Sequence, residues 1–146
     1  MLTYTIMFSK SNLLSTLVTG IYFFIAGYLI WGVLTVDFFA SHAGTASGVM
    51  KDPPDMIFIA LGCLIQALFL STIYGKWARG HHSAKHGMEY GALVGAFMGL
   101  GMGLLWYGTS NLSDLTGVFV EAILDIVFMA IGGALIAIMY KSTSSE

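Results

Sequence analysis

The chain has 146 residues, of which 57% are hydrophobic and only 10% are charged. Soluble domains carry about 25% charged residues, so the composition excludes an ordinary soluble domain and favours a membrane protein. The formal net charge of −2 gives no reason to expect nucleic acid as a partner. Cys63 is the single cysteine, which excludes an intrachain disulfide.

Four apolar runs follow one another along the chain, each long enough to cross a hydrocarbon core, which takes about 20 helical residues. They cover approximately residues 13–36, 56–77, 88–107 and 117–140. The runs are continuous rather than alternating, which leaves helices as the structure that satisfies every backbone group in lipid. We therefore predict an all-α membrane protein with one domain, residues 1–146, made of four transmembrane helices.

The basic residues predict the orientation of these spans. If both termini lie on one side, that side holds five basic residues: Lys10, Lys76, Arg79, Lys85 and Lys141. The other side holds only Lys51. By the positive-inside rule, both termini are expected in the cytoplasm.

Aromatic residues lie at the predicted ends of the spans. Trp31 and Trp106 close the first and third spans on the outer side. The inner ends carry Tyr74, Trp77, Tyr90 and Tyr140. Such residues prefer the headgroup level, so we expect them to anchor the helices at the interface. A redox or stacking role is the alternative.

An internal repeat is one interpretation of two similar pairs of segments. Residues 58–67 resemble residues 128–137, and residues 29–32 resemble residues 104–107. A duplication would make the protein two parallel helical hairpins, a design that some transporters use. Chance similarity in a membrane sequence of few residue types is the other interpretation.

Histidines in two loops allow a weak hypothesis of metal binding. The long first loop, about residues 37–55, holds His42 with Asp37 and Asp52. In the second loop, His82 and His86 have the spacing of two ligands on one helix face. Neighbouring lysine and arginine disfavour a bound cation there, so a basic loop facing anionic headgroups is the favoured interpretation. We predict no metal site.

A ladder of glycines at every fourth position marks the third span: Gly87, Gly91, Gly95, Gly99 and Gly103. Residues at this spacing share one helix face, which here lacks side chains. In lipid, such a face lets two helix backbones approach closely. Its partner is the first or fourth helix, another protein chain, or a flat cofactor or lipid. The cofactor, if there is one, stays unknown.

Two acids in the fourth span are candidates for a proton or ion site. Glu121 and Asp125 lie one helical turn apart on one face, and acids inside a membrane are functional candidates. A carboxyl bonded to a neighbouring group, or one that contacts a partner chain, is the alternative. Gln66, near the middle of the second span, is expected to form a hydrogen bond between helices.

The second half of the chain resembles small uncharacterised four-helix bacterial membrane proteins with glycine-rich spans. The resemblance rests on residues 104–108, residues 111–117 and the glycine ladder. It implies a bacterial cytoplasmic membrane and names no activity, so no functional residue follows from it.

These observations predict a non-enzymatic accessory or assembly subunit that packs in a larger membrane complex through the glycine-ladder helix. Its partners would be lipids and other transmembrane subunits or a second copy of itself. The alternative is a small proton- or cation-coupled transporter or channel that uses Asp125 and Glu121. An enzyme ranks third, because the sequence has no evident pair of nucleophile and base.

Overall fold

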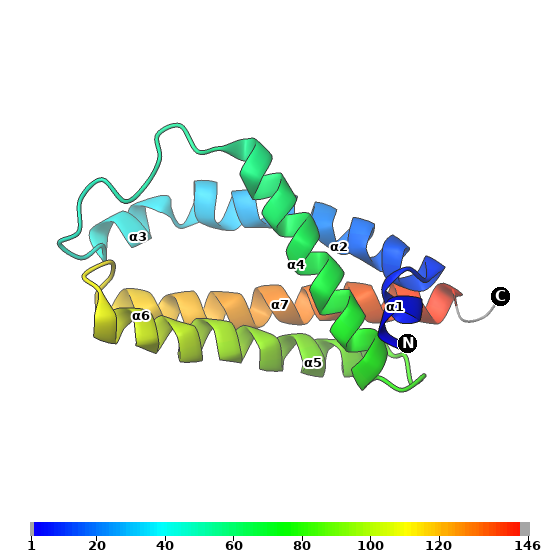
Figure 1. The fold of residues 1–146 in the computed structure, drawn as a ribbon. Helices are drawn as coiled ribbons and strands as arrows, with labels where there is room; N and C mark the ends of the chain where they lie inside the picture. The colour runs from blue at the N-terminus through cyan, green and yellow to red at the C-terminus, as the bar shows by residue number, and fades with distance from the viewer. Residues whose placement is uncertain (1, 144–146) are drawn as a thin grey trace.

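The protein is an all-helical bundle in the computed structural model, which describes residues 2–143 (Figure 1). In chain order the helices are α1 (Leu2–Met7), α2 (Lys10–Leu29), the π-helical segment η1 (Ile30–Leu34), α3 (Val36–Ser41), α4 (Met56–Trp77), α5 (Ala84–Ala96), the π-helical segment η2 (Phe97–Met102), α6 (Gly103–Thr109) and α7 (Leu115–Thr143).

Four helical stretches are long and apolar enough to cross a membrane, and they indicate an integral membrane protein. They are Lys10–Leu34, Met56–Trp77, Ala84–Thr109 and Leu115–Thr143. Met56–Trp77 has the predicted bounds. The other three stretches differ from the predicted spans by two to four residues at each end. The difference arises because polar residues at a helix end keep their helical hydrogen bonds beyond the apolar run.

Side-chain caps explain where the helices begin. Ser9 accepts a hydrogen bond from the backbone N–H of Asn12 at the start of α2. Asp55 and Ser83 do the same for α4 and α5. Each cap satisfies one of the backbone N–H groups that have no partner inside the helix. The capping residues Ser9, Asp55 and Ser83 therefore mark where these three helices begin.

The tightest packing joins α5, η2 and α6 to α7, with α2 against α4 as the second large contact. In Figure 1, α4 crosses the bundle diagonally, so that the end of α4 at Trp77 lies near α5 and the end at Met56 lies away from α7. The long segment between α3 and α4 bridges this separation (Figure 1). As a result, the bundle is closed at the end that holds both termini and open at the other.

The glycine ladder faces α7. An added Cβ on Gly91 would overlap the carbonyl of Met129, and one on Gly95 would lie 2.5 Å from the carbonyl oxygen of Asp125. An added Cβ on Gly133 of α7 would in turn overlap the backbone of Gly87. Gly103, the last member of the ladder, meets only a side chain, that of Val118 at 3.2 Å. The partner of the glycine ladder in the structure is therefore α7, the fourth span of the same chain.

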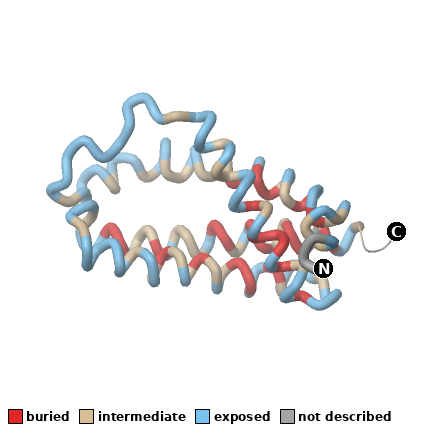
Figure 2. The backbone as a smooth tube through the Cα atoms, in the orientation of Figure 1, coloured by how far each residue is buried: buried red, intermediate tan, exposed pale blue. Residues whose placement is uncertain are grey.

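Buried residues gather at the end of the bundle that carries the termini (Figure 2). Tyr74, Tyr90 and Tyr140 are 0%, 5% and 6% exposed, and the Tyr74 ring packs edge to face against each of the other two rings. The expectation that these tyrosines anchor the helices in the headgroup region is therefore wrong. Of the predicted inner anchors, Trp77 alone has a largely exposed side chain. The tyrosines turn inward because each hydroxyl finds a protein partner.

A buried polar network holds α2, α4 and α7 together at this end. The Asn12 amide nitrogen donates to the Met7 carbonyl and to the Thr72 hydroxyl. The Tyr140 hydroxyl donates to the Asn12 amide oxygen at 3.0 Å. Ser15 and Ser71 share a further hydrogen bond of 2.7 Å between α2 and α4. Asn12 is fully buried, so its bonds replace those that water would have made.

The first and third loops pair with each other at the open end. Gly44 donates from its backbone to the Leu112 carbonyl, and Ala46 donates to the Asn111 carbonyl. An added side chain at Gly44 would overlap the Asn111 carbonyl, which explains a glycine at this close approach. This pairing joins the loop after α3 to the loop between α6 and α7.

The internal duplication stays a prediction. The chain does form two hairpins, α2 with α4 and α5 with α7. However, the second hairpin packs backbone against backbone through its glycines, whereas Gly20 of the first meets the side chain of Leu64.

Candidate functional site

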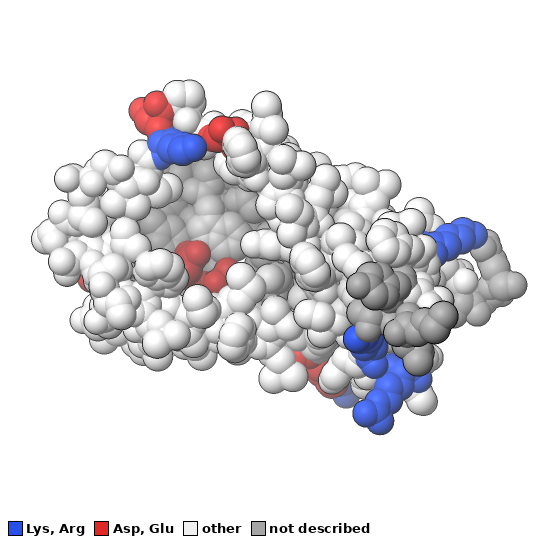
Figure 3. All heavy atoms as spheres, viewed as in Figure 1, with Lys and Arg blue, Asp and Glu red and all other residues white. Residues whose placement is uncertain are grey.

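A hollow of about 270 Å³ lies between the four spans, where α4 leaves the bundle. We call it the central hollow. It is lined by Phe23, Phe24, Gly27, Tyr28, Trp31, Ile59, Cys63, Gln66, Met98, Glu121, Asp125, Phe128 and Met129. Figure 3 shows a hollow in this face of the molecule with acidic oxygens in its floor. The lining contains no lysine or arginine.

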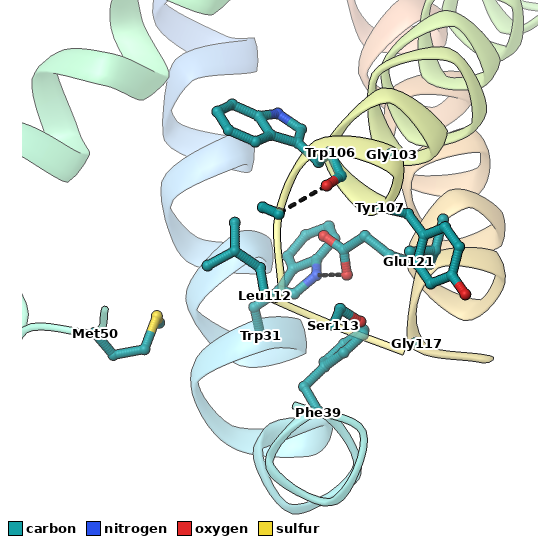
Figure 4. A pocket seen from close by; sticks show the side chains of 12 residues that line it. Trp31, Phe39, Met50, Gly103, Trp106, Tyr107, Leu112, Ser113, Gly117 and Glu121 are labelled. Carbon is teal, nitrogen blue, oxygen red and sulfur yellow. Dashed lines mark hydrogen bonds between the residues drawn. The ribbon is translucent and has the colours of Figure 1, made fainter. Parts of the chain in front are cut away.

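Both acids that stand out in the sequence line the central hollow. Glu121 and Asp125 come from α7 and are partly buried. The Trp31 indole N–H donates to a Glu121 carboxylate oxygen at 2.8 Å (Figure 4). Within the described residues, the Asp125 carboxylate has no hydrogen-bond or ion-pair partner. The two acids therefore differ, because one is held by a donor from α2–η1 and the other faces the hollow without one.

Gln66 also lies in the lining of the central hollow, on α4. Its side chain is exposed rather than buried between helices, and it has no hydrogen-bond partner in the part of the chain that the structure describes. The expected interhelical hydrogen bond of Gln66 is thus not formed. Its side chain lines the hollow where α4 leaves the bundle instead of packing against another helix.

Both π-helical segments contribute to this region. Trp31 belongs to η1 and Met98 to η2, and both side chains line the central hollow. At the end of η1 the Thr35 N–H bonds to the Ile30 carbonyl, five residues back, at 2.9 Å. A π-helical turn changes the direction of the side chains that follow it and occurs often at functional sites.

A second cavity, of about 420 Å³, lies next to the central hollow toward the loops. We call it the outer cavity (Figure 4). Its lining is Trp31, Phe39, Met50, Gly103, Trp106, Tyr107, Ser110, Leu112, Ser113, Gly117, Val118 and Glu121. Trp31 and Glu121 line both cavities, so their hydrogen bond forms part of the shared wall.

The predicted outer anchors therefore have two different positions. Trp31 is partly buried and bonded to Glu121. Trp106 is 56% exposed, as expected for an anchor, although it also lines the outer cavity. Sequence reasoning missed the bond between Trp31 and Glu121. Each residue stood out separately, but no local pattern relates positions 90 residues apart.

His42 and Asp114 form an ion pair beside the outer cavity. The His42 Nδ1 atom lies 2.8 Å from an Asp114 carboxylate oxygen. The other Asp114 oxygen accepts a hydrogen bond of 2.7 Å from the Gly117 N–H at the start of α7. This backbone bond, followed by the His42 contact, lowers the pKa of Asp114 below its usual value. Asp114 thus caps α7 and joins the first loop to it.

Replacing Asp114 by asparagine is expected to remove an acid-sensitive part of the stability. Because the pKa is lower in the folded protein, the charged Asp114 stabilises the fold above its ordinary pKa of 3.8, and this stabilisation is lost as the pH falls through the lowered value. In thermal unfolding in detergent at neutral pH, wild type should have a higher melting temperature than Asp114→Asn. This difference in melting temperature should disappear below about pH 4.

The control for this prediction is Asp37→Asn, which removes an exposed acid at the start of α3. It should leave the pH dependence unchanged. A constant gap between wild type and Asp114→Asn at every pH would contradict the role assigned to the charge.

The histidines do not gather into a metal site. Among the described residues, no group of three or more His, Cys, Asp or Glu side chains is placed to hold a metal ion. The His82 ring packs against Tyr74 and Tyr140, and the His86 ring lies 4.3 Å from the Trp77 ring, centre to centre. Burial lowers the pKa of His82, and the charges of His81 and His86 lower it further. Both effects favour the neutral form of the His82 ring.

Comparisons with protein-family models, with curated proteins and with solved structures gave no match. The argument for function therefore depends on the geometry of the two cavities.

Proposed function

We propose that the protein handles a proton or another cation in the membrane, as a small coupled transporter or channel, through Asp125 and Glu121. The observation that carries the proposal is the central hollow, which has these two carboxylates in its lining and no basic residue. Acids inside a membrane are costly unless they are paired or reach water, and they mark proton and ion pathways. The outer cavity, which adjoins the hollow toward the loops, would supply the path to water in this proposal.

In this proposal the two acids have different tasks. Asp125 is the group that gains and loses the cation, because it has no hydrogen-bond donor among the described residues. Glu121 lies one turn closer to the loops and receives the Trp31 indole N–H. It would take up the cation between the outer cavity and Asp125. We further propose that both termini are cytoplasmic, so that the outer cavity faces away from the cytoplasm.

Asp125→Asn is expected to abolish cation movement and leave the fold intact. Asparagine keeps the shape of aspartate but has no charge and does not titrate. The measurement is flux of H⁺, Na⁺ or K⁺ in proteoliposomes, with a pH-sensitive dye inside, for wild type and variant at equal protein content. Flux in the variant should fall to that of empty liposomes.

The matched control is Glu89→Gln, because Glu89 is an exposed acid on α5 away from both cavities. It should retain wild-type flux. Wild-type flux in Asp125→Asn, with the thermal stability of both proteins equal, would end the proposal for this residue.

An accessory or assembly subunit of a larger membrane complex is the second candidate function. The separation of α4 from α7 favours it, because a helix of a partner could enter there and place a lysine or arginine against Asp125. The glycine ladder does not serve this contact, since all five of its glycines face α7. In this case Asp125→Asn would loosen the complex, because the partner's buried cation would lose its counter-ion at a cost of roughly 3–5 kcal/mol.

Mass spectrometry of the intact particle after gentle extraction separates the two candidates. A lone chain or homo-oligomer with Asp125-dependent flux supports the transporter. A hetero-complex that Asp125→Asn dissociates supports the subunit. Both candidates are non-enzymatic and involve lipid and protein partners rather than nucleic acid.

A further inference from the structure

We propose that the central hollow binds a small organic ammonium ion whose nitrogen carries apolar groups, with Asp125 as its counter-ion. This inference rests on the proposed function, in which Glu121 and Asp125 handle a cation, and it names the class of that cation.

The negative charge in the lining of the central hollow favours a bound cation. Glu121 and Asp125 are the charged residues of the central hollow, and both are acids. Glu121 has a neutral donor, the Trp31 indole N–H, and Asp125 has no donor among the described residues. A bound cation would supply the opposite charge that the protein does not provide there, in a place where an isolated carboxylate is costly.

The rest of the lining is aromatic, and this suits an ammonium ion with apolar groups. Tyr28, Trp31 and Phe24 lie on the α2–η1 side of the hollow, and Phe128 lies on α7 beside the acids. Aromatic ring faces attract cations electrostatically, and sets of such rings recognise quaternary ammonium groups. The same rings bury the apolar groups of the ion, which the hydrophobic effect favours.

Inorganic ions fit the hollow less well. Ca²⁺ takes six to eight oxygen ligands and Mg²⁺ about six in octahedral geometry. The side chains of Glu121, Asp125 and Gln66 supply carboxylate and amide oxygens, whereas most of the remaining lining is aromatic, aliphatic or sulfur-containing. Among the described residues no larger cluster of metal-ligating side chains is present. An organic ammonium ion carries its own apolar surface and needs fewer oxygen contacts.

The size and position of the two cavities limit the ligand. The central hollow measures about 270 Å³, which is below the roughly 300–1,000 Å³ of pockets for drug-sized molecules. The outer cavity, at about 420 Å³, shares Trp31 and Glu121 with it. In this inference the ion enters from the outer cavity and passes the Trp31–Glu121 hydrogen bond to reach Asp125.

Benzyltrimethylammonium is the probe that tests this inference, with its neutral carbon isostere neopentylbenzene as the control ligand. Isothermal titration calorimetry on the purified protein in detergent measures binding at constant ionic strength. We expect saturable binding of the cation that excess Na⁺ does not displace and that the neutral isostere does not compete. Asp125→Asn should weaken it about tenfold or more, and Glu89→Gln should not change it.

The aromatic contribution needs its own variants. Tyr28→Ala is suited to this purpose, because Tyr28 is 54% exposed and its removal leaves the packed core untouched. Tyr28→Ala and Trp31→Leu should each weaken binding several-fold, while Trp31→Phe retains a ring and should lose less. Circular dichroism confirms that each variant is folded.

The outcomes separate this inference from the proposed function. Equal binding of the cation by wild type and Asp125→Asn, or equal binding of the neutral isostere, overturns the inference. No binding of the cation, together with Asp125-dependent flux of H⁺ or Na⁺, overturns the inference and leaves the proposed function standing. No binding and no Asp125-dependent flux overturns both.

Discussion

Gly91→Ala is expected to destabilise the protein by about 1–3 kcal/mol, although alanine is the better helix former. The added methyl group would overlap the carbonyl of Met129 and lie 3.0 Å from the Cα of Ala130. Both atoms belong to the backbone of α7, which cannot rotate away as a side chain can. The α5 and α7 backbones would have to separate along their whole contact, and dispersion contacts between them would weaken.

Gly62→Ala is the matched control, since an added Cβ on this α4 glycine meets no heavy atom within 4 Å. There the substitution should be neutral or stabilise the helix by up to about 1 kcal/mol. Equilibrium unfolding in mixed detergent and denaturing surfactant, followed by circular dichroism, measures both variants. Equal stability of the two alanine variants would contradict the close approach of α5 and α7.

Asn12→Ala is expected to lower the free energy of unfolding by about 1–3 kcal/mol, because each of its buried partners loses one hydrogen bond. The Tyr140 hydroxyl loses one of its acceptors and keeps the Ser71 carbonyl, and the Met7 carbonyl and Thr72 hydroxyl lose a donor. Asn12 is 0% exposed, so water does not replace these bonds without rearrangement. The effect should be on stability alone, because the network lies at the opposite end of the bundle from both cavities.

Two further variants test this explanation. Asn111→Ala, in an exposed loop position, should change stability by no more than about 0.5 kcal/mol. Tyr140→Phe removes the hydroxyl that donates to Asn12, and the double variant should cost less than the sum of the single ones. Simple additivity of the two substitutions would show that the Asn12–Tyr140 hydrogen bond contributes little.

The inner end of the bundle shows where sequence reasoning stops. Tyr74, Tyr90 and Tyr140 lie at span ends, where tyrosine commonly anchors a helix in the headgroup region. Which face of its helix a tyrosine occupies is visible from the sequence, but which faces meet other helices is not. The polar network that receives their hydroxyl groups joins residues of three helices, and the Asn12–Tyr140 hydrogen bond joins residues 128 positions apart along the chain.

The acids of the candidate site could be predicted from the sequence, but the residues that surround them could not. Glu121 and Asp125 stand out because charged residues are rare in an apolar span, and this is a local property. Trp31, the aromatic lining and the outer cavity come from helices that only packing brings together. Gln66 shows the opposite case, because a local rule predicted a buried amide and the divergence of α4 left it exposed.

The sequence by itself determined the four spans and the close-packing face of the third one. Both follow from short-range physics, since the thickness of the hydrocarbon core sets the length of an apolar run and the helical period aligns every fourth residue. Only the tertiary structure decided that α7 occupies the glycine face, that α4 separates from the bundle, and that Trp31 reaches Glu121. These contacts depend on which pairs of helix surfaces pack best together, a property of distant segments that no single segment contains.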